Sequence, residues 1–126
     1  GIKDQIIQMN VSDSKLNVLY SKALAFVFPS LYEGFGMPIL EAFSNNCPVC
    51  LSNSSCFPEI AGEAGAYFNP YDHSSIANTV ERVIYDKNYS AELVTAGQKR
   101  LASFSWKKTL EETLNTYSKA VELEIN

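Results

Sequence analysis

The sequence predicts an α/β fold, a Rossmann-like parallel sheet with flanking helices. Two observations carry this prediction. Between residues 5 and 70, short apolar runs alternate with segments whose apolar residues recur at helical spacing, as in βαβ units. The run Ala25–Phe28 is also free of polar residues, which is typical of a strand buried on both faces of a parallel sheet.

The strands and helices can be assigned in chain order. Strands are expected at Gln5–Met9, Ala25–Phe28, Pro48–Leu51 and Ala66–Phe68. Between them, Ser12 offers an N-cap to a helix through residues 13–23, Pro38 opens a second helix, and Pro58 begins a short helix that Gly62 stops.

The chain is expected to be helical after residue 73. Ser74 or Ser75 would cap one helix, Ser90 or a neighbour a second, and Ser105 a third that starts at Trp106. This last helix carries an apolar face of Leu110, Leu114, Tyr117 and Val121. We therefore expect one domain over residues 1–126, a size typical of a single unit, with a helical segment over 74–126.

The charge distribution limits the classes of ligand. A net charge of −4 argues against an electrostatic binder of nucleic acid or of membrane surfaces. Residues 1–80 contain only the cations Lys3, Lys15 and Lys22, and no arginine precedes Arg82. A phosphate bound by this part of the chain must be met by backbone N–H groups, by distant basic residues or by cations outside the chain.

Cysteine and histidine usage does not indicate a metal site. Cys47, Cys50 and Cys56 are an odd number, one short of a four-thiolate zinc site. The spacing of Cys47 and Cys50 fits a redox C-x-x-C motif, but their place on an apolar run favours buried, structural thiols. His73 is the only histidine and is expected to be solvated or to cap a helix. We expect no metal.

Residues 28–41, FPSLYEGFGMPILE, are the candidate site because ligands of such sheets bind beyond the carboxyl ends of the strands. Gly34 and Gly36 allow close approach of the backbone to a ligand, and the following helix start offers N–H groups and a positive dipole. Glu33 and Glu41 are expected to face one crevice, where carboxylates suit a vicinal diol. The alternative is structural, with Glu33 a loop acid and Glu41 an acid stabilised by the helix dipole.

This segment closely resembles the signature of retaining glycosyltransferases of the group-1 type (family 4, GT-B fold), whose hallmark is two glutamates separated by seven residues. The resemblance continues through five further stretches: residues 47–49, 58–60, 62–65, 67–70 and 104–106. It implies that the chain is the C-terminal, nucleotide-sugar-binding domain of such an enzyme, with its first βα unit missing.

The resemblance also implies roles for the residues of the loop. Glu33 would be the catalytic-site glutamate beside the 3- and 4-hydroxyls of the transferred sugar, and Glu41 would accept the ribose hydroxyls. Leu40 would lie beside phosphate or ribose. The backbone N–H groups of Gly34, Phe35, Gly36 and Met37 would donate to the sugar or the diphosphate. Pro29 and Ser30, which precede them, would shape the approach to the site.

The chain departs from the family pattern in two places. The glycine-rich turn and basic residues that clamp the diphosphate are absent, so we expect the clamp and the acceptor domain to lie upstream, and the isolated chain to be inactive. Met9-Asn10-Val11 stands where the family has glycine, a hydrophobic residue and valine, which leaves the base-side pocket undefined.

The resemblance predicts transfer of a sugar from a nucleotide-diphosphate sugar to an acceptor hydroxyl with retention, without a cofactor. It also implies that no metal is needed, because the helix start and basic residues do the work that a divalent ion does in other enzymes. The acceptor, a glycan or lipid-linked glycan, would be bound by the missing domain in polysaccharide biosynthesis. Reduced thiols favour a cytoplasmic location. If the full-length protein associates with a membrane, it would lie on the cytoplasmic face. The alternatives are a GT-B phosphorylase or nucleotide-sugar epimerase, or a non-catalytic α/β binding module. The donor sugar, base and acceptor are not specified by the sequence.

Overall fold

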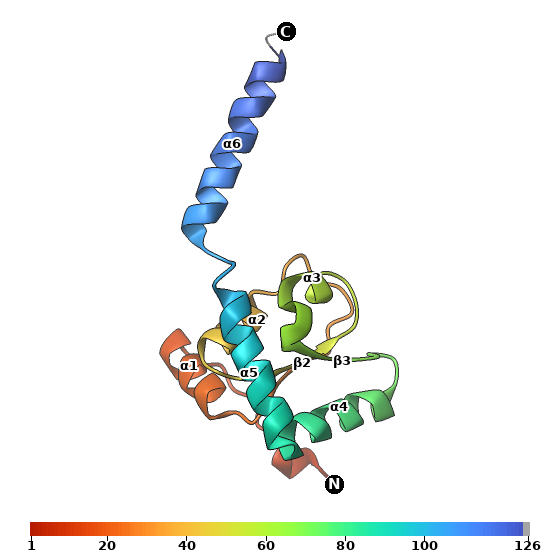
Figure 1. Ribbon diagram of the computed structural model, residues 1–126. Coiled ribbons are helices and arrows are strands. Elements are labelled where there is room, and N and C mark those ends of the chain that lie inside the picture. The colour runs from red at the N-terminus through yellow and green to blue at the C-terminus, as the bar shows by residue number, and fades with distance from the viewer. Residues whose placement is uncertain (125–126) are drawn as a thin grey trace.

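The computed structural model describes residues 1–124 as three strands surrounded by helices (Figure 1). In chain order the elements are η1 (Lys3–Gln5), α1 (Asp13–Lys22), β1 (Phe26–Phe28), α2 (Met37–Ser44), β2 (Val49–Ser52), α3 (Phe57–Ala61), η2 (Gly62–Ala64), β3 (Gly65–Phe68), α4 (His73–Tyr85), α5 (Lys87–Leu101) and α6 (Trp106–Glu124).

The three strands form a parallel sheet in the order β1-β2-β3. Phe26 of β1 is level with Val49 of β2, and Val49 is level with Gly65 of β3. The predicted α/β class with a parallel sheet and flanking helices is confirmed. Because all three strands point the same way, the loops that follow β1 and β2 meet at one edge of the sheet.

Each face of the sheet carries its own hydrophobic core, because successive side chains of a strand point to opposite faces. Val49 and Leu51 pack with α1, α2, α3 and the end of α5. Cys50 packs with Ala66, Phe68, α4 and the start of α5. β2 is buried along its whole length, as expected for a strand covered on both sides. Cys47 and Cys50 are buried free thiols, in agreement with the structural interpretation.

The N-caps of the later helices differ in part from expectation. Ser105 caps α6 as predicted, its Oγ accepting a bond from Lys108 N at 3.1 Å. However, α4 is capped by Asp72, whose Oδ1 accepts from Ser74 N at 2.9 Å, and α5 by Asp86, which accepts from Tyr89 N at 3.0 Å. Asp72 lies two residues before Ser74 and Asp86 four residues before Ser90, where the aspartate side chain can reach the free N–H groups of the first helical turn.

The predicted strand at Gln5–Met9 does not form. Residues 3–5 make one turn of 3-10 helix instead, and Ile6 and Ile7 are 66% and 76% exposed. Within the described residues, β1 is an edge strand of the sheet. A further strand beside β1 would need other elements packed on its faces to bury its side chains. No helix within residues 1–124 covers Ile6 and Ile7, so the apolar pattern alone did not produce a strand.

α6 projects away from the body formed by the other elements (Figure 1). Its predicted apolar face is present but exposed; it consists of Leu110, Leu114, Tyr117 and Val121. None of the helices in residues 1–124 combines the length and the apolar character that crossing a bilayer requires.

Candidate functional site

The candidate site is the loop 29–36, which leaves the carboxyl end of β1 and enters α2. The loop 53–56, which leaves the carboxyl end of β2 and enters α3, lies against it. Ser54 Oγ donates to Leu31 O at 3.3 Å, and Ser55 Oγ donates to Glu33 O at 2.9 Å. The parallel topology therefore places the predicted loop at the expected edge of the sheet, in contact with a neighbouring loop.

Gly36 makes the sharp turn from the loop into α2. Its φ is +97°, and a Cβ at this position would lie 3.1 Å from both Ile39 Cδ1 and Phe57 Cε1. Only glycine meets both requirements without strain. Gly34, two residues earlier, has no atom within 4 Å of the corresponding point, so its backbone is open on that side.

The backbone between Glu33 and α2 has free donors. Within residues 1–124, the amides of Gly34, Phe35 and Gly36 donate no hydrogen bond to the chain. The first N–H groups of a helix also lack partners inside it, and the helix dipole makes this end positive. This stretch can therefore hold an oxyanion or several hydroxyl oxygens.

Glu33 is half-buried and held on two sides. Ser30 Oγ donates to Glu33 Oε1 at 2.8 Å, and the Glu33 amide donates to Ser55 Oγ at 3.1 Å. The predicted site residues Ser30 and Glu33 are thus in direct contact. The bond from Ser30 fixes Glu33 Oε1 and leaves Oε2 as an acceptor for a ligand.

Glu41 lies one turn into α2 and is held by Tyr20 of α1. The Tyr20 hydroxyl donates to Glu41 Oε2 at 3.3 Å. Burial and then the nearby Glu41 carboxylate raise the pKa of Tyr20 to about 12, so this hydroxyl remains a donor over the physiological range. Within residues 1–124, Glu41 Oε1 accepts no hydrogen bond. One oxygen is anchored, and the other is free to accept from a ligand.

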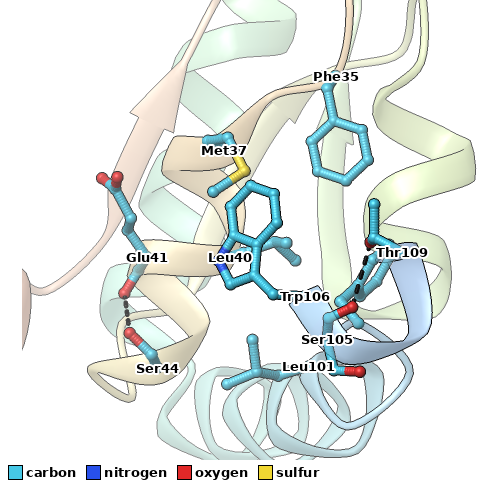
Figure 2. A pocket seen from close by; sticks show the side chains of 10 residues that line it. Phe35, Met37, Leu40, Glu41, Ser44, Leu101, Ser105, Trp106 and Thr109 are labelled. Carbon is cyan, nitrogen blue, oxygen red and sulfur yellow. Dashed lines mark hydrogen bonds between the residues drawn. The ribbon is translucent and has the colours of Figure 1, made fainter. Parts of the chain in front are cut away.

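A cavity of about 550 Å³ lies beside the site, between α2, the end of α5 and the start of α6 (Figure 2). Four predicted site residues line it, namely Phe35, Met37, Leu40 and Glu41. The rest of its wall is largely apolar and includes Leu101, Phe104 and Trp106. Figure 2 shows the Glu41 carboxylate at the rim, directed away from the Trp106 ring.

Of the two glutamates, Glu41 lines the cavity beside α2 and Glu33 does not. The Glu33 carboxylate accepts from Ser30, and the Glu33 backbone contacts Ser55 of the loop 53–56. The expectation that both carboxylates face one crevice at the carboxyl ends of the strands stays a prediction.

Sequence reasoning missed several residues that hold the site. Tyr20, Ser55 and Cys56 bind Glu41 or the loop, and Phe104 meets Phe35 edge-on at 5.9 Å between ring centroids. Each of these contacts joins residues that lie at least 21 positions apart in the sequence. The one signal in the sequence was position, because Ser55 and Cys56 follow a strand neighbouring β1 and so belong at the same edge.

No group of three or more metal-ligating side chains occurs in residues 1–124. The cavity beside α2 contains no lysine, arginine or histidine in its wall. A bound diphosphate would depend here on the backbone donors and the helix start.

Comparison with known proteins identifies the family. The family model for glycosyl transferases group 1 matches residues 1–100. The chain belongs to this family.

Related proteins agree with this assignment. The chain is 38% identical over 107 residues to O-antigen chain mannosyltransferase B of Escherichia coli, an alignment that covers 85% of the chain and 28% of the relative. It is 29% identical over 126 residues to MMP alpha-(1->4)-mannosyltransferase of Mycolicibacterium hassiacum, covering 96% of the chain and 31% of that protein.

A solved structure supports the fold. Sucrose-phosphate synthase from Thermosynechococcus elongatus superposes with a TM-score of 0.84 at 25% identity, covering 97% of this chain and 32% of the other. The chain thus spans about a third or less of the length of the relatives it matches.

Proposed function

We propose that this group-1 glycosyltransferase chain is the donor-binding part of a longer retaining enzyme that transfers a sugar, mannose in our proposal, from a nucleotide-diphosphate sugar to a glycan hydroxyl. The observation that carries the proposal is the loop 33–36, where free backbone amides lie between the half-buried Glu33 and the start of α2. The choice of mannose is supported by the names of the relatives.

The loop would act mainly through its backbone. The amides of Gly34, Phe35 and Gly36 and the start of α2 would stabilise the negative charge that develops on the departing diphosphate. The acceptor oxygen would bond to the anomeric carbon on the face from which the diphosphate leaves, as the bond to the diphosphate oxygen breaks and that oxygen takes the hydroxyl proton, which retains the anomeric configuration. No step is assigned to a metal or a cofactor.

The two glutamates would position the donor. Glu33 would accept from sugar hydroxyls through the oxygen that Ser30 leaves free, and Glu41 would accept from ribose through Oε1 while Tyr20 holds Oε2. Leu40 and Met37 would line the approach beside them. Such positioning lowers the entropic part of the barrier.

Other parts of the full-length protein would complete the enzyme. The basic clamp for the diphosphate and the acceptor site, for a glycan or lipid-linked glycan, would lie outside these residues. A cytoplasmic location is part of the proposal and is supported by the free thiols of Cys47 and Cys50.

Titration of the full-length protein with UDP, GDP, ADP and their sugar conjugates tests this function. We expect one nucleotide series to bind, with transfer from its mannosyl conjugate to an acceptor glycan. Glu41→Ala should weaken binding of the nucleotide, whereas Glu33→Gln should chiefly reduce turnover. Tyr85→Phe, which changes an exposed residue of α4, is the control. Failure of every nucleotide sugar to bind would reject the proposal.

A further inference from the structure

The loop 53–56 contacts the candidate-site loop 29–36 through side chains rather than through backbone pairing. Ser54, Ser55 and Cys56 are consecutive, and each reaches a backbone carbonyl of the loop 31–35, which lies more than twenty residues earlier in the chain. β1 and β2 are adjacent and parallel, so their following loops start side by side. The three side chains turn this proximity into specific bonds.

Ser55 makes the closest set of contacts. Its Oγ accepts from the Glu33 amide at 3.1 Å and donates to the Glu33 carbonyl at 2.9 Å. A single hydroxyl therefore satisfies both backbone groups of Glu33. Ser55 adopts a φ of +55°, which is unfavourable for a residue with a side chain. The surrounding structure holds Ser55 in this conformation, in which it bonds to Glu33.

Cys56 adds a second connection to the same segment. Its Sγ lies 3.3 Å from Glu33 O and 3.1 Å from Phe35 O. The thiol has one proton and can donate to one of the two carbonyls at a time. Together, Ser55 and Cys56 bind the backbone on either side of Gly34, the residue whose own surroundings are open.

We propose that Ser55 is a positioning residue for sugar transfer, which sets the place of the Glu33 carboxylate and of the adjacent free amides. This inference rests on the proposed function of the loop. The Glu33 side chain is oriented by Ser30, but Ser30 belongs to the same loop and does not connect it to another element. Ser55 lies three residues after the buried strand β2 and bonds to Glu33, so it connects the loop to the body of the domain.

A substitution can remove the hydroxyl without straining the fold. Ser55→Gly deletes the hydroxyl and adopts a positive φ without cost, so the domain should remain folded. Ser55→Ala deletes the hydroxyl and keeps the backbone strain. Thr95→Ala is the matched control, because Thr95 makes a hydroxyl-to-carbonyl bond of 2.9 Å to Ala91 O on the exposed face of α5, away from the site.

Kinetics of the full-length enzyme with its nucleotide sugar separate positioning from general damage. For Ser55→Gly we expect kcat to fall by roughly 10- to 100-fold, because small misplacements of positioning groups have effects of this size. The melting temperature and the Kd for the nucleoside diphosphate without the sugar should stay at the wild-type values. Thr95→Ala should match the wild type in all three quantities.

Amide hydrogen exchange provides a readout that does not depend on turnover. In the wild type, the Glu33 amide is bonded to Ser55 and should exchange slowly, whereas in Ser55→Gly and Ser55→Ala it should exchange faster. Unchanged kcat and unchanged exchange in an active enzyme would overturn the positioning role alone. Equal losses of kcat, nucleotide affinity and melting temperature would also overturn it, in favour of a structural role. A wild-type protein that transfers no sugar would instead reject the proposed function.

Discussion

Gly34 and Gly36 lie two residues apart, yet the structure constrains only the second. Gly36→Ala would place a Cβ at a φ of +97° and 3.1 Å from Phe57 and Ile39, whereas Gly34→Ala would meet nothing within 4 Å. We expect Gly36→Ala to lower the free energy of unfolding by about 1–3 kcal/mol. Gly34→Ala should change it by less than about 0.5 kcal/mol. Urea denaturation of the two variants checks this, and equal losses would contradict it.

Tyr20 lies outside the predicted loop but determines how Glu41 is presented. Tyr20→Phe keeps the ring, which packs edge-on against Phe26, and removes only the hydroxyl that donates to Glu41 Oε2. If Glu41 accepts from ribose, we expect the Kd for the nucleotide to rise by about 3- to 10-fold, the equivalent of one modest hydrogen bond. Isothermal titration of the full-length protein measures it. A Kd equal to that of Tyr85→Phe would show that Glu41 needs no such support.

At the scale of elements, α5 packs on α2 through one glycine. A Cβ at Gly97 would lie 2.6 Å from Phe43 Cδ1, and the side chain of Gln98 donates to the Phe43 carbonyl beside it. Alanine normally favours a helix over glycine by about 1 kcal/mol. Here the clash with the buried Phe43 ring should outweigh this gain, so we expect Gly97→Ala to destabilise by about 1–3 kcal/mol.

A double-mutant cycle with Phe43→Leu tests the cause of that loss. Phe43→Leu alone creates space and should also destabilise the domain. Because the two changes compensate in volume, the double variant should be more stable than the sum of the single losses predicts. Strict additivity in thermal or urea denaturation would show that contact with Phe43 is not what excludes a side chain at position 97.

The elements themselves were largely predictable, and the exceptions have local causes. Strands β1, β2 and β3 and helices α1 to α6 lie within a few residues of their expected positions, because apolar runs, proline and Gly62 mark them in the sequence. The strand at residues 5–9 failed, since a pattern of isoleucines predicts a strand only where neighbours cover it. The contacts of Arg100 at the end of α5 were not visible in the sequence: it donates to Ile60 O at 2.9 Å, and its guanidinium carbon lies 5.0 Å from the centroid of the Phe104 ring.

At the scale of the whole molecule, the sequence indicated the candidate loop but not the side chains that hold it. The spacing of Glu33, Gly34, Gly36 and Glu41 is local and was visible in the sequence. The bonds from Tyr20 and Ser55 depend on which strands become neighbours, and this follows from topology rather than from spacing.

The stability of the whole domain should depend steeply on alkaline pH. Burial raises the pKa of Tyr20 and Tyr67 to about 12, and burial also raises that of the Cys50 thiol to about 12. The folded chain keeps these protons at pH values where the unfolded chain releases them. The stability that these protonated groups contribute is therefore fully present below the pKa of the unfolded chain, which is near 10 for tyrosine. It is lost as pH rises toward 12.

The slope of this loss can be attributed to single groups. Each group should contribute up to about 1.4 kcal/mol per pH unit between its unfolded and folded pKa. Tyr20→Phe and Tyr67→Phe should each make the fall in unfolding free energy between pH 10 and 12 shallower, whatever their effect at pH 7. Tyr85→Phe, with a side chain 79% exposed, should leave the slope unchanged. Urea denaturation across this range measures the slopes, and equal slopes in all three variants would mean that the buried tyrosines ionise as readily in the folded chain as in the unfolded one.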